Sequence, residues 1–386
     1  MSFQQPEQTE KKIKSVAAES GHVEAILRAC DVLRTWRYEG ELLRLRDVLL
    51  RVPQLRKTTA HRVLRSLVAG GLIERVSAEQ YRSLVRPLAH RRRRIGYAGQ
   101  AQDSMFSSIV SASFVRAAAE HDVDLVIVNN RYSARTAVRN AESLVRDHVD
   151  LVIEFQTYEN VAPVVANRFL EVGIPVIAIE IPHPGAIYFG ANNYQAGLIG
   201  GRALGKWAKE NWNGVVDHLL LLEEQIAGPL PKSRITGMLN GVREMLPQTE
   251  SARVLLYDGK GSFEHSMNVV RKYIRTSTAR RVLVMAGNDS SALGALRAFE
   301  ESGRAQYCAV MGQNGIPEAL EELRRKGSRL IGTVAYFPER YGDEVIPLAL
   351  SMLGGKSLPP AVFVKHRLLV AANVDSVYPP VPPNGT

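Results

Sequence analysis

The chain has 386 residues, which is too long for one ordinary hydrophobic core, so we expect two or three domains. Residues 1–94 contain 20 Lys and Arg against 10 Asp and Glu, whereas residues 95–386 contain 29 of each, so the whole net charge of +10 lies in the first quarter. The chain has no apolar run of about 18 residues and its first 15 residues lack an apolar core, which argues against a membrane span and a secretory signal.

Three helices are predicted in the basic region, after a polar and mobile tail at residues 1–20. The first covers His22–Tyr38. The second covers Leu42–Val52 and is broken by Pro53. The third, Lys57–Gly71, has an apolar stripe at helical spacing and ends at two glycines, which tolerate the left-handed C-cap conformation. Its stripe consists of Ala60, Val63, Leu64, Leu67 and Val68.

Two short strands follow the third helix, at Leu72–Val76 and Tyr81–Leu84. Helix, turn, helix and hairpin is the order of a winged helix-turn-helix, whose second helix lies in the major groove of DNA. We therefore predict a DNA-binding domain over residues 21–85. The alternative is a small helical subdomain whose cationic face is only solvated. The candidate DNA-binding residues are Lys57, Thr58, Thr59, His61, Arg62 and Arg65.

Leu55–Arg62 (LRKTTAHR) resembles the recognition helix of the IclR-type winged helix family of bacterial regulators, and the resemblance covers about Val23–Leu84. It departs at Pro53-Gln54, where that family usually has a glycine turn. The resemblance implies a transcriptional regulator.

Residues 86–94 (RPLAHRRRR) are predicted to form a basic linker. Four consecutive arginines would gain charge-assisted contacts near DNA phosphates. A solvated linker without that role explains the same residues equally well.

From Ile95 onward, short apolar runs alternate with amphipathic helical segments, which predicts parallel sheets covered by helices on both faces. So many strands in about 290 residues indicate two sheets rather than one. The predicted strands are Ile95–Gly99, Asp124–Asn129, Asp150–Phe155, Pro175–Ile181, His218–Glu223, Arg253–Tyr257, Arg281–Ala286, Tyr307–Met311, Leu330–Ala335 and Ala361–Val370.

Polar and aromatic side chains follow several of these strands, at the edge where ligands gather in such sheets. Carboxylates and amides bond hydroxyl pairs, arginine donates in a fixed fork, and aromatic rings cover C–H faces, so this mixture suits a polyhydroxylated ligand. Polar residues that only occupy loops or cap helices are the alternative, and Asp289 is predicted to be the N-cap of Ser290–Ser302. The candidate ligand-binding residues are Gln100, Asp103, Phe106, Glu180, Arg234, Asn288, Asn314 and Tyr336.

Val284–Phe299 (VMAGNDSSALGALRAF) resembles a strand-to-helix stretch of ribose-binding protein and of the periplasmic binding protein-like sensor domains of lactose-repressor type. Gly190–Gly201 and Met311–Pro317 match the same family, and the resemblance spans nearly all of residues 95–370. It implies two α/β lobes joined by three crossing segments, with a sugar clamped between them. Lobe 1 is expected at about 95–191 and 337–365, lobe 2 at about 192–336 and 366–378, and a tail at 379–386.

The family's ligand positions carry over with several departures. Asn288 and Arg234 match well. Glu180 and Asn314 stand where the family usually has aspartate, Gln313 where it has an aromatic residue, and Tyr336 where it has a polar amide.

Motifs of an enzyme are absent from the sequence. Ile95–Gln100 (IGYAGQ) is not a dinucleotide-binding loop, and neither a phosphate-binding loop nor a nucleophile elbow occurs. The histidines show no metal-ligand spacing. His183 is the one within reach of the expected cleft, but a structural role in its loop is the favoured interpretation. We therefore predict no catalytic residue, no metal and no cofactor.

Together these features predict a ligand-responsive transcriptional regulator that senses a sugar or polyol and binds a DNA operator as a homodimer, without membrane contact. Two cysteines, Cys30 and Cys308, form no disulfide framework and fit a cytoplasmic location. The alternatives are a solute-binding component of a sugar transport system and an enzyme on a Rossmann-like fold.

Overall fold

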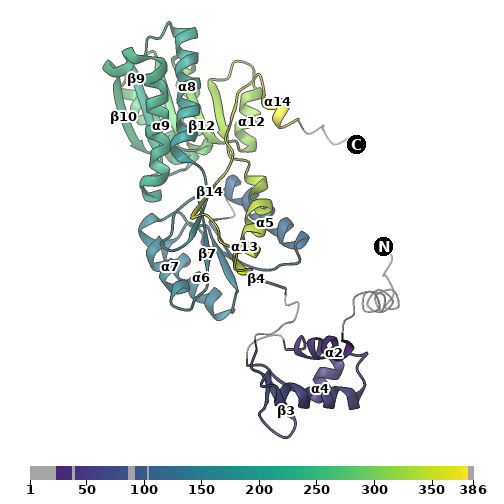
Figure 1. Cartoon of the computed structure of the whole chain (residues 1–386). Helices are drawn as coiled ribbons and strands as arrows, with labels where there is room; N and C mark the ends of the chain where they lie inside the picture. The colour runs from purple at the N-terminus through teal and green to yellow at the C-terminus, as the bar shows by residue number, and fades with distance from the viewer. Residues whose placement is uncertain (1–22, 37–39, 86–91, 102–103, 381–386) are drawn as a thin grey trace. The chain divides into compact units, whose positions relative to one another are not determined.

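A computed structural model describes residues 23–36, 40–85, 92–101 and 104–380 of the chain. The chain divides into two compact units, residues 1–92 and 93–386 (Figure 1). Within the described ranges, no helix has the length and apolar character needed to cross a bilayer.

In its described residues, the first unit packs the helices α2, α3 and α4 on a three-stranded antiparallel sheet of order β1-β3-β2. Its core includes Trp36, Val48, Leu64, Ile73 and Tyr81. The elements, in chain order, are α2 (Glu24–Leu33), β1 (Leu42–Arg44), α3 (Leu45–Arg51), α4 (Lys57–Ala69), β2 (Ile73–Arg75) and β3 (Gln80–Ser83).

The predicted third helix and the two predicted strands are confirmed, and the apolar stripe of α4 faces the core at Ala60, Leu64 and Leu67. The second predicted helix is too long, because Leu42–Arg44 pairs with β3 as strand β1 before α3 begins. Helical spacing alone missed this strand, since its three residues satisfy the hydrogen bonds of a sheet edge that lies 38 residues further along the chain.

The second unit consists of two α/β lobes, and this part of the predicted fold class is confirmed (Figure 1). In lobe 1, α5 (Met105–Glu120) and α13 (Tyr341–Leu353) cover one face of a parallel sheet, and α6 (Ala134–Arg146) and α7 (Ala162–Leu170) cover the other. Its strands, in sheet order, are β14 (Ala361–Phe363), β8 (Ile187–Gly190), β7 (Val176–Ile179), β6 (Leu151–Glu154), β4 (Arg94–Gly99) and β5 (Asp124–Asn129).

In lobe 2, α8 (Asn193–Trp212) and α9 (Pro229–Met245) cover one face of the sheet. The other face is covered by α10 (Phe263–Thr276), α11 (Asp289–Glu301) and α12 (Pro317–Arg324). The strands, in sheet order, are β10 (Arg253–Asp258), β9 (His218–Glu223), β11 (Val282–Ala286), β12 (Cys308–Asn314), β13 (Leu330–Ala335) and the antiparallel β15 (Arg367–Leu369). A short helix, α14 (Val374–Val377), follows β15.

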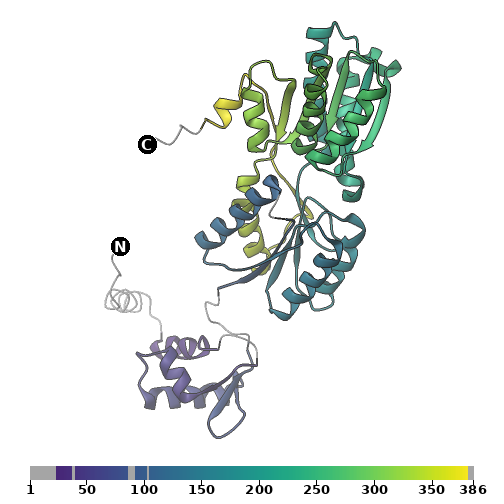
Figure 2. The same ribbon diagram turned by 180° about the vertical axis from the view of Figure 1, so that it is seen from behind.

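The chain passes between the lobes at three places, which Figure 2 shows from behind. The first crossing joins β8 to α8, and the second joins β13 to α13 through a 3-10 turn, η5 (Pro338–Arg340). The third joins β14 to β15. The predicted strand Ala361–Val370 is therefore wrong as a single element, because its two halves pair with different sheets.

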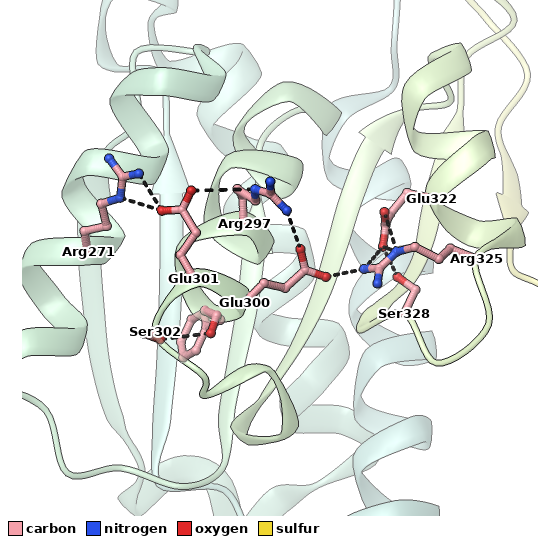
Figure 3. A network of polar contacts seen from close by, with 9 residues as sticks. Arg271, Arg297, Glu300, Glu301, Ser302, Glu322, Arg325 and Ser328 are labelled. Atoms are coloured by element: carbon pink, nitrogen blue, oxygen red, sulfur yellow. Dashed lines mark hydrogen bonds and ion pairs between the residues drawn. The ribbon is translucent and has the colours of Figure 1, made fainter.

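A chain of ion pairs links α10, α11 and the end of α12 on the outer surface of lobe 2 (Figure 3). Its members are more than one sixth exposed, and such pairs contribute little stability each in water. The network therefore neutralises charge on this surface more than it holds the helices together. Its members are Arg271, Arg297, Glu300, Glu301, Glu322 and Arg325.

Four glycines let α8 and α9 approach with their backbones almost in contact. A Cβ atom on Gly197 would lie 2.0 Å from the carbonyl oxygen of Arg234, and one on Gly201 would lie 2.1 Å from that of Met238. From α9, Gly237 and Gly241 face α8 in the same way. The contact sets the position of the α9 backbone that carries Arg234.

We expect Gly201→Ala to lower the free energy of unfolding by about 1–3 kcal/mol, because the added methyl group must push two helix backbones apart. The midpoint of urea unfolding measures the effect. Gly354→Ala is the control, since its Cβ would lie 3.3 Å from its nearest neighbour and its φ of −80° suits alanine. Equal midpoints for the two variants would contradict the close contact.

Candidate functional site

A cleft of about 720 Å³ lies between the two lobes, at the carboxyl ends of strands from both sheets. Parallel sheets place ligands at this edge, where strands end and loops begin. Six of the eight predicted ligand-binding residues line the cleft; Tyr336 does not, and Asp103 lies outside the described residues. The six are Gln100, Phe106, Glu180, Arg234, Asn288 and Asn314.

Glu180, just after β7, is a buried carboxylate with a strained backbone, since its φ of +61° lies in the left-handed region. Gly190 makes room for it, because a Cβ there would lie 3.0 Å from the Glu180 carboxylate. Its Oε1 accepts a hydrogen bond from the Tyr341 hydroxyl at 2.5 Å. Within the described residues its Oε2 has no hydrogen-bond partner. Burial raises the pKa of Glu180, against the opposing charge of Arg234 and the bond from Tyr341.

Arg234, on the second turn of α9, brings a buried guanidinium to the cleft. Its Nε and one terminal nitrogen donate to Asn193 Oδ1 at 3.0 and 2.6 Å, and the other donates to the carbonyl of Gly287 at 2.5 Å. The guanidinium also lies 4.9 Å from the centre of the Tyr336 ring. One terminal nitrogen forms an ion pair with Glu180 Oε2 at 3.7 Å, a distance too long for a hydrogen bond.

The wall of the cleft that lobe 1 provides contains both polar and aromatic side chains. Gln100, after β4, donates to the Thr157 hydroxyl at 2.6 Å and accepts from the Tyr132 hydroxyl at 3.1 Å. Phe106 presents its ring beside that of Phe155, with ring centres 6.4 Å apart in an edge-to-face arrangement. Such a wall matches a ring that has hydroxyl groups on its rim and C–H groups on its face.

Asn288 and Asn314 come from lobe 2. Asn288 is the N-cap of α11, since its Oδ1 accepts from the Ser291 backbone at 2.8 Å. The prediction that Asp289 caps this helix is therefore wrong. Asp289 is instead buried and accepts from the backbone of Gly315 and Ile316 at 2.7 and 2.9 Å, which holds the loop after β12.

Asn314 ends β12 with a φ of +111°, a backbone conformation that L-residues rarely adopt. In the described part of the chain, no hydrogen bond engages its side-chain amide. The amide offers one donor group and one acceptor to a ligand in the cleft.

Tyr336 lies behind the cleft and contacts its residues rather than lining it. Its hydroxyl donates to Gln313 Oε1 at 2.9 Å, and its ring supports the guanidinium of Arg234. His183, for which the sequence favours a structural role in its loop, is buried with its Nδ1 2.9 Å from the carbonyl of Ile181 and is not among the lining residues.

Sequence reasoning missed several lining residues, among them Glu224, Lys260 and Tyr132. Glu224 follows β9 directly, so its position at a strand end could have identified it. Burial raises the pKa of Glu224 to about 7, with Arg234 opposing the shift. Lys260 lies two residues after β10, and Tyr132 lies three residues after β5; their positive φ values, of 50° and 47°, could not be predicted from sequence.

The cleft therefore combines carboxylates, an arginine, amides and aromatic rings. Among the described residues, no group of three His, Cys, Asp or Glu could hold a metal ion. The arrangement can bind a small molecule with several hydroxyl groups through oriented hydrogen bonds.

The predicted DNA-binding residues lie together on α4 in the other unit. Lys57, Thr58, His61, Arg62 and Arg65 are exposed, and Thr59 is half-buried. Within the described ranges, no ion pair engages the cations among them. A face of unpaired cations is the electrostatic arrangement that attracts a polyanion.

A second buried carboxyl lies in lobe 1 behind the cleft. Glu154, the last residue of β6, accepts from Asn130 Nδ2 at 2.7 Å through Oε1, and its buried Oε2 has no partner in the described part of the structure. Burial raises the pKa of Glu154 to about 8, with the Asn130 bond opposing the shift. Glu154 is therefore protonated in the folded chain at neutral pH.

We expect the free energy of unfolding to fall as pH rises from about 4.5 to about 8, because only the unfolded chain releases the Glu154 proton in this range. Glu154→Gln cannot ionise and should remove a slope on the order of 1 kcal/mol per pH unit. Urea unfolding at a series of pH values measures this. Glu171→Gln, at an exposed carboxylate of the same lobe, should keep the wild-type slope. Parallel pH profiles for all three proteins would contradict the assignment.

Comparison with known proteins identifies relatives of the second unit. The model of the periplasmic binding protein domain matches residues 95–357. The D-ribose/D-allose-binding protein of Pseudomonas aeruginosa is 25% identical over 252 residues, which are 62% of this chain and 75% of that protein. The ribose import binding protein of Salmonella typhimurium is 33% identical over 87 residues, which are 22% of this chain and only 28% of that protein.

Two solved structures show the same fold. A solute-binding protein of an ABC transporter from Mycobacterium smegmatis, with bound glycerol, has a TM-score of 0.66 at 17% identity and covers 74% of this chain and 96% of its own. A periplasmic solute-binding protein of an ABC transporter from Actinobacillus succinogenes, with bound D-allose, has a TM-score of 0.64 at 18% identity. The match covers 73% of this chain and 99% of that protein.

Proposed function

Since the chain belongs to the periplasmic binding protein domain family, we propose that its cleft binds a sugar or a related polyol. The observation that carries this proposal is the pair formed by Glu180 and Arg234. Among the described residues, the Glu180 acceptor has no hydrogen-bond partner, and it lies 3.7 Å from a donor of Arg234 that lines the same cleft, so adjacent hydroxyl groups of a ligand would bond to both. The ligands in the names of similar structures, D-allose, glycerol and myo-inositol, support this ligand class.

We further propose that ligand binding regulates DNA binding, and that the protein is a transcriptional regulator. The support is the first unit, in which α3, α4 and the strands β2 and β3 follow one another in the order of a winged helix-turn-helix, and in which Leu55–Arg62 resembles the IclR type in sequence. Helix α4 would lie in the major groove, with Arg62 and Arg65 on base edges or phosphates and Lys57 and Thr58 on phosphates.

The proposed partner is a DNA operator with two-fold symmetry, bound by a homodimer in the cytoplasm. One winged head makes too few contacts for useful specificity, so two heads on related half-sites are expected. A ligand that prefers one arrangement of the lobes would shift the population of the dimer between states with different DNA affinity.

A second candidate is a solute-binding component of a sugar transport system. The named relatives favour it, since they are import or ABC transporter binding proteins. The family match begins at residue 95, so this candidate gives no role to the basic unit before it. Binding to duplex DNA distinguishes the two candidates.

We expect Arg234→Ala to abolish the rise in melting temperature that the best ligand gives to the wild-type protein. The ligand is the most stabilising compound in a thermal-shift panel of pentoses, hexoses and polyols. Arg234→Lys should also lose most of the shift, because an ammonium group keeps the charge but not the planar set of N–H donors of a guanidinium. Arg202→Ala, at an exposed ion pair of α8, is the control and should keep the full shift. An unchanged shift in Arg234→Ala would exclude this residue from the site.

We expect Arg62→Ala to abolish binding to an operator selected from random duplexes, because Arg62 is exposed on the face of α4 that would meet DNA. For its residual binding to non-specific duplex, the slope of the logarithm of the binding constant against the logarithm of the salt concentration should be smaller in magnitude by about one. Fluorescence anisotropy at several salt concentrations measures both.

Two further measurements complete this experiment. Arg28→Ala, at a paired arginine of α2, is the control and should bind nearly as wild type. The thermal shift given by the ligand should be intact in both variants. A wild-type chain that ignores duplex DNA at low ionic strength would rule out the regulator and leave the transport candidate.

A further inference from the structure

Contacts of the His366 side chain connect the three crossings between the lobes. The backbone N–H of Asn192, in the first crossing, donates to Nε2 of His366, in the third, at 3.1 Å. The ring of His366 meets that of Tyr336, at the start of the second crossing, edge to face with ring centres 5.0 Å apart. One imidazole therefore contacts both other crossings.

Arg234 closes these contacts into a ring. Its guanidinium lies 4.9 Å from the centre of the Tyr336 ring and donates two hydrogen bonds to Asn193 Oδ1. Asn193 is the covalent neighbour of Asn192, so the circuit returns to its beginning. The circuit runs through Asn192, His366, Tyr336, Arg234 and Asn193, and we call it the hinge ring.

The hinge ring requires a neutral imidazole. Nε2 of His366 accepts a hydrogen bond, so it carries no proton and the ring proton lies on Nδ1. Burial, and then the charge of Arg234, lower the pKa of His366 to about 4. The acceptor is therefore present at neutral pH, and a protonated ring would put a second cation beside Arg234.

We propose that His366 is a positioning residue, which clasps the three crossings and, through Tyr336, holds Arg234 toward Glu180 and the cleft. This inference rests on the proposed binding of a polyol in the cleft. A ligand that engages Arg234 is then two side-chain contacts from every crossing. The hinge ring therefore couples ligand binding to the angle between the lobes: a ligand that favours one angle is itself bound more tightly at that angle.

Two substitutions separate the hydrogen bond from the ring packing. His366→Gln keeps an acceptor oxygen near the position of Nε2 but removes the ring. His366→Phe keeps a ring against Tyr336 but leaves the N–H of Asn192 without an acceptor. His121→Phe, at an exposed histidine that ends α5, is the matched control.

The first measurement is amide hydrogen exchange of the peptide that contains Asn192, on the full chain without ligand. We expect faster exchange in His366→Phe than in wild type, and exchange near the wild-type rate in His366→Gln and His121→Phe. Wild-type exchange in His366→Phe would overturn the clasp, because the Asn192 bond would then not restrain the crossing. This measurement needs no ligand, so it tests whether His366 restrains the first crossing even if the cleft binds no sugar.

The second measurement is the affinity for D-allose by calorimetry. His366→Gln, which removes the ring that packs on Tyr336, should weaken binding about five- to tenfold, and His366→Phe, which keeps a ring there, should retain most of the affinity. Equal affinity in His366→Gln and wild type would overturn the positioning role. A wild-type chain that binds neither D-allose nor any other polyol of the panel would instead refute the proposed function, with the exchange result standing apart from it.

Discussion

The guanidinium of Arg234 is a buried charge, and the second unit is arranged around the need to compensate it. Removing a cation from water is costly unless hydrogen bonds and an opposite charge replace the solvent. Asn193, Gly287 and the face of Tyr336 supply most of that replacement. Glu180 supplies the opposite charge through an ion pair of 3.7 Å, but no hydrogen bond joins the two groups. That hydrogen-bonding capacity is left for a ligand in the cleft.

The position of Arg234 depends in turn on residues that have no side chain. The glycines of α8 and α9 bring the two backbones into contact, with Gly197 against the carbonyl of Arg234 itself. Gly190 likewise leaves room for the Glu180 carboxylate. Since α8 begins at the first crossing, the same packing that places the guanidinium also fixes the start of a hinge segment. Binding residues and hinge are therefore built from one set of contacts.

The two units differ in how their surface charges are paired. On lobe 2, acidic and basic residues of three helices neutralise one another at the surface, as the network in Figure 3 shows. On α4, the cations point outward and no ion pair engages them within the described residues. These cations belong to the first 94 residues, which hold the whole net charge of +10. A neutral body and a basic head are suited to separate ligands.

The two lobes and their three crossings were implied by the family resemblance. From hydrophobic periodicity and strand–helix alternation, which are local patterns, the sequence predicted the α4 helix and two parallel sheets covered by helices. It also placed Gln100, Glu180, Arg234 and Asn288 at strand and helix ends, where parallel sheets gather their polar residues. Which of these residues line the cleft and which support it from behind depends on tertiary contacts.

Three residues show why. Tyr336 follows a strand as the lining residues do, yet Gln313 and Arg234 hold it behind the cleft. Asp289 has the position of a cap, yet its carboxylate holds the loop after β12, 26 residues away. His366 lies in a stretch that reads as one strand, yet that stretch divides between two sheets. Each outcome depends on contacts between segments distant in sequence, and local patterns carry no information about such contacts.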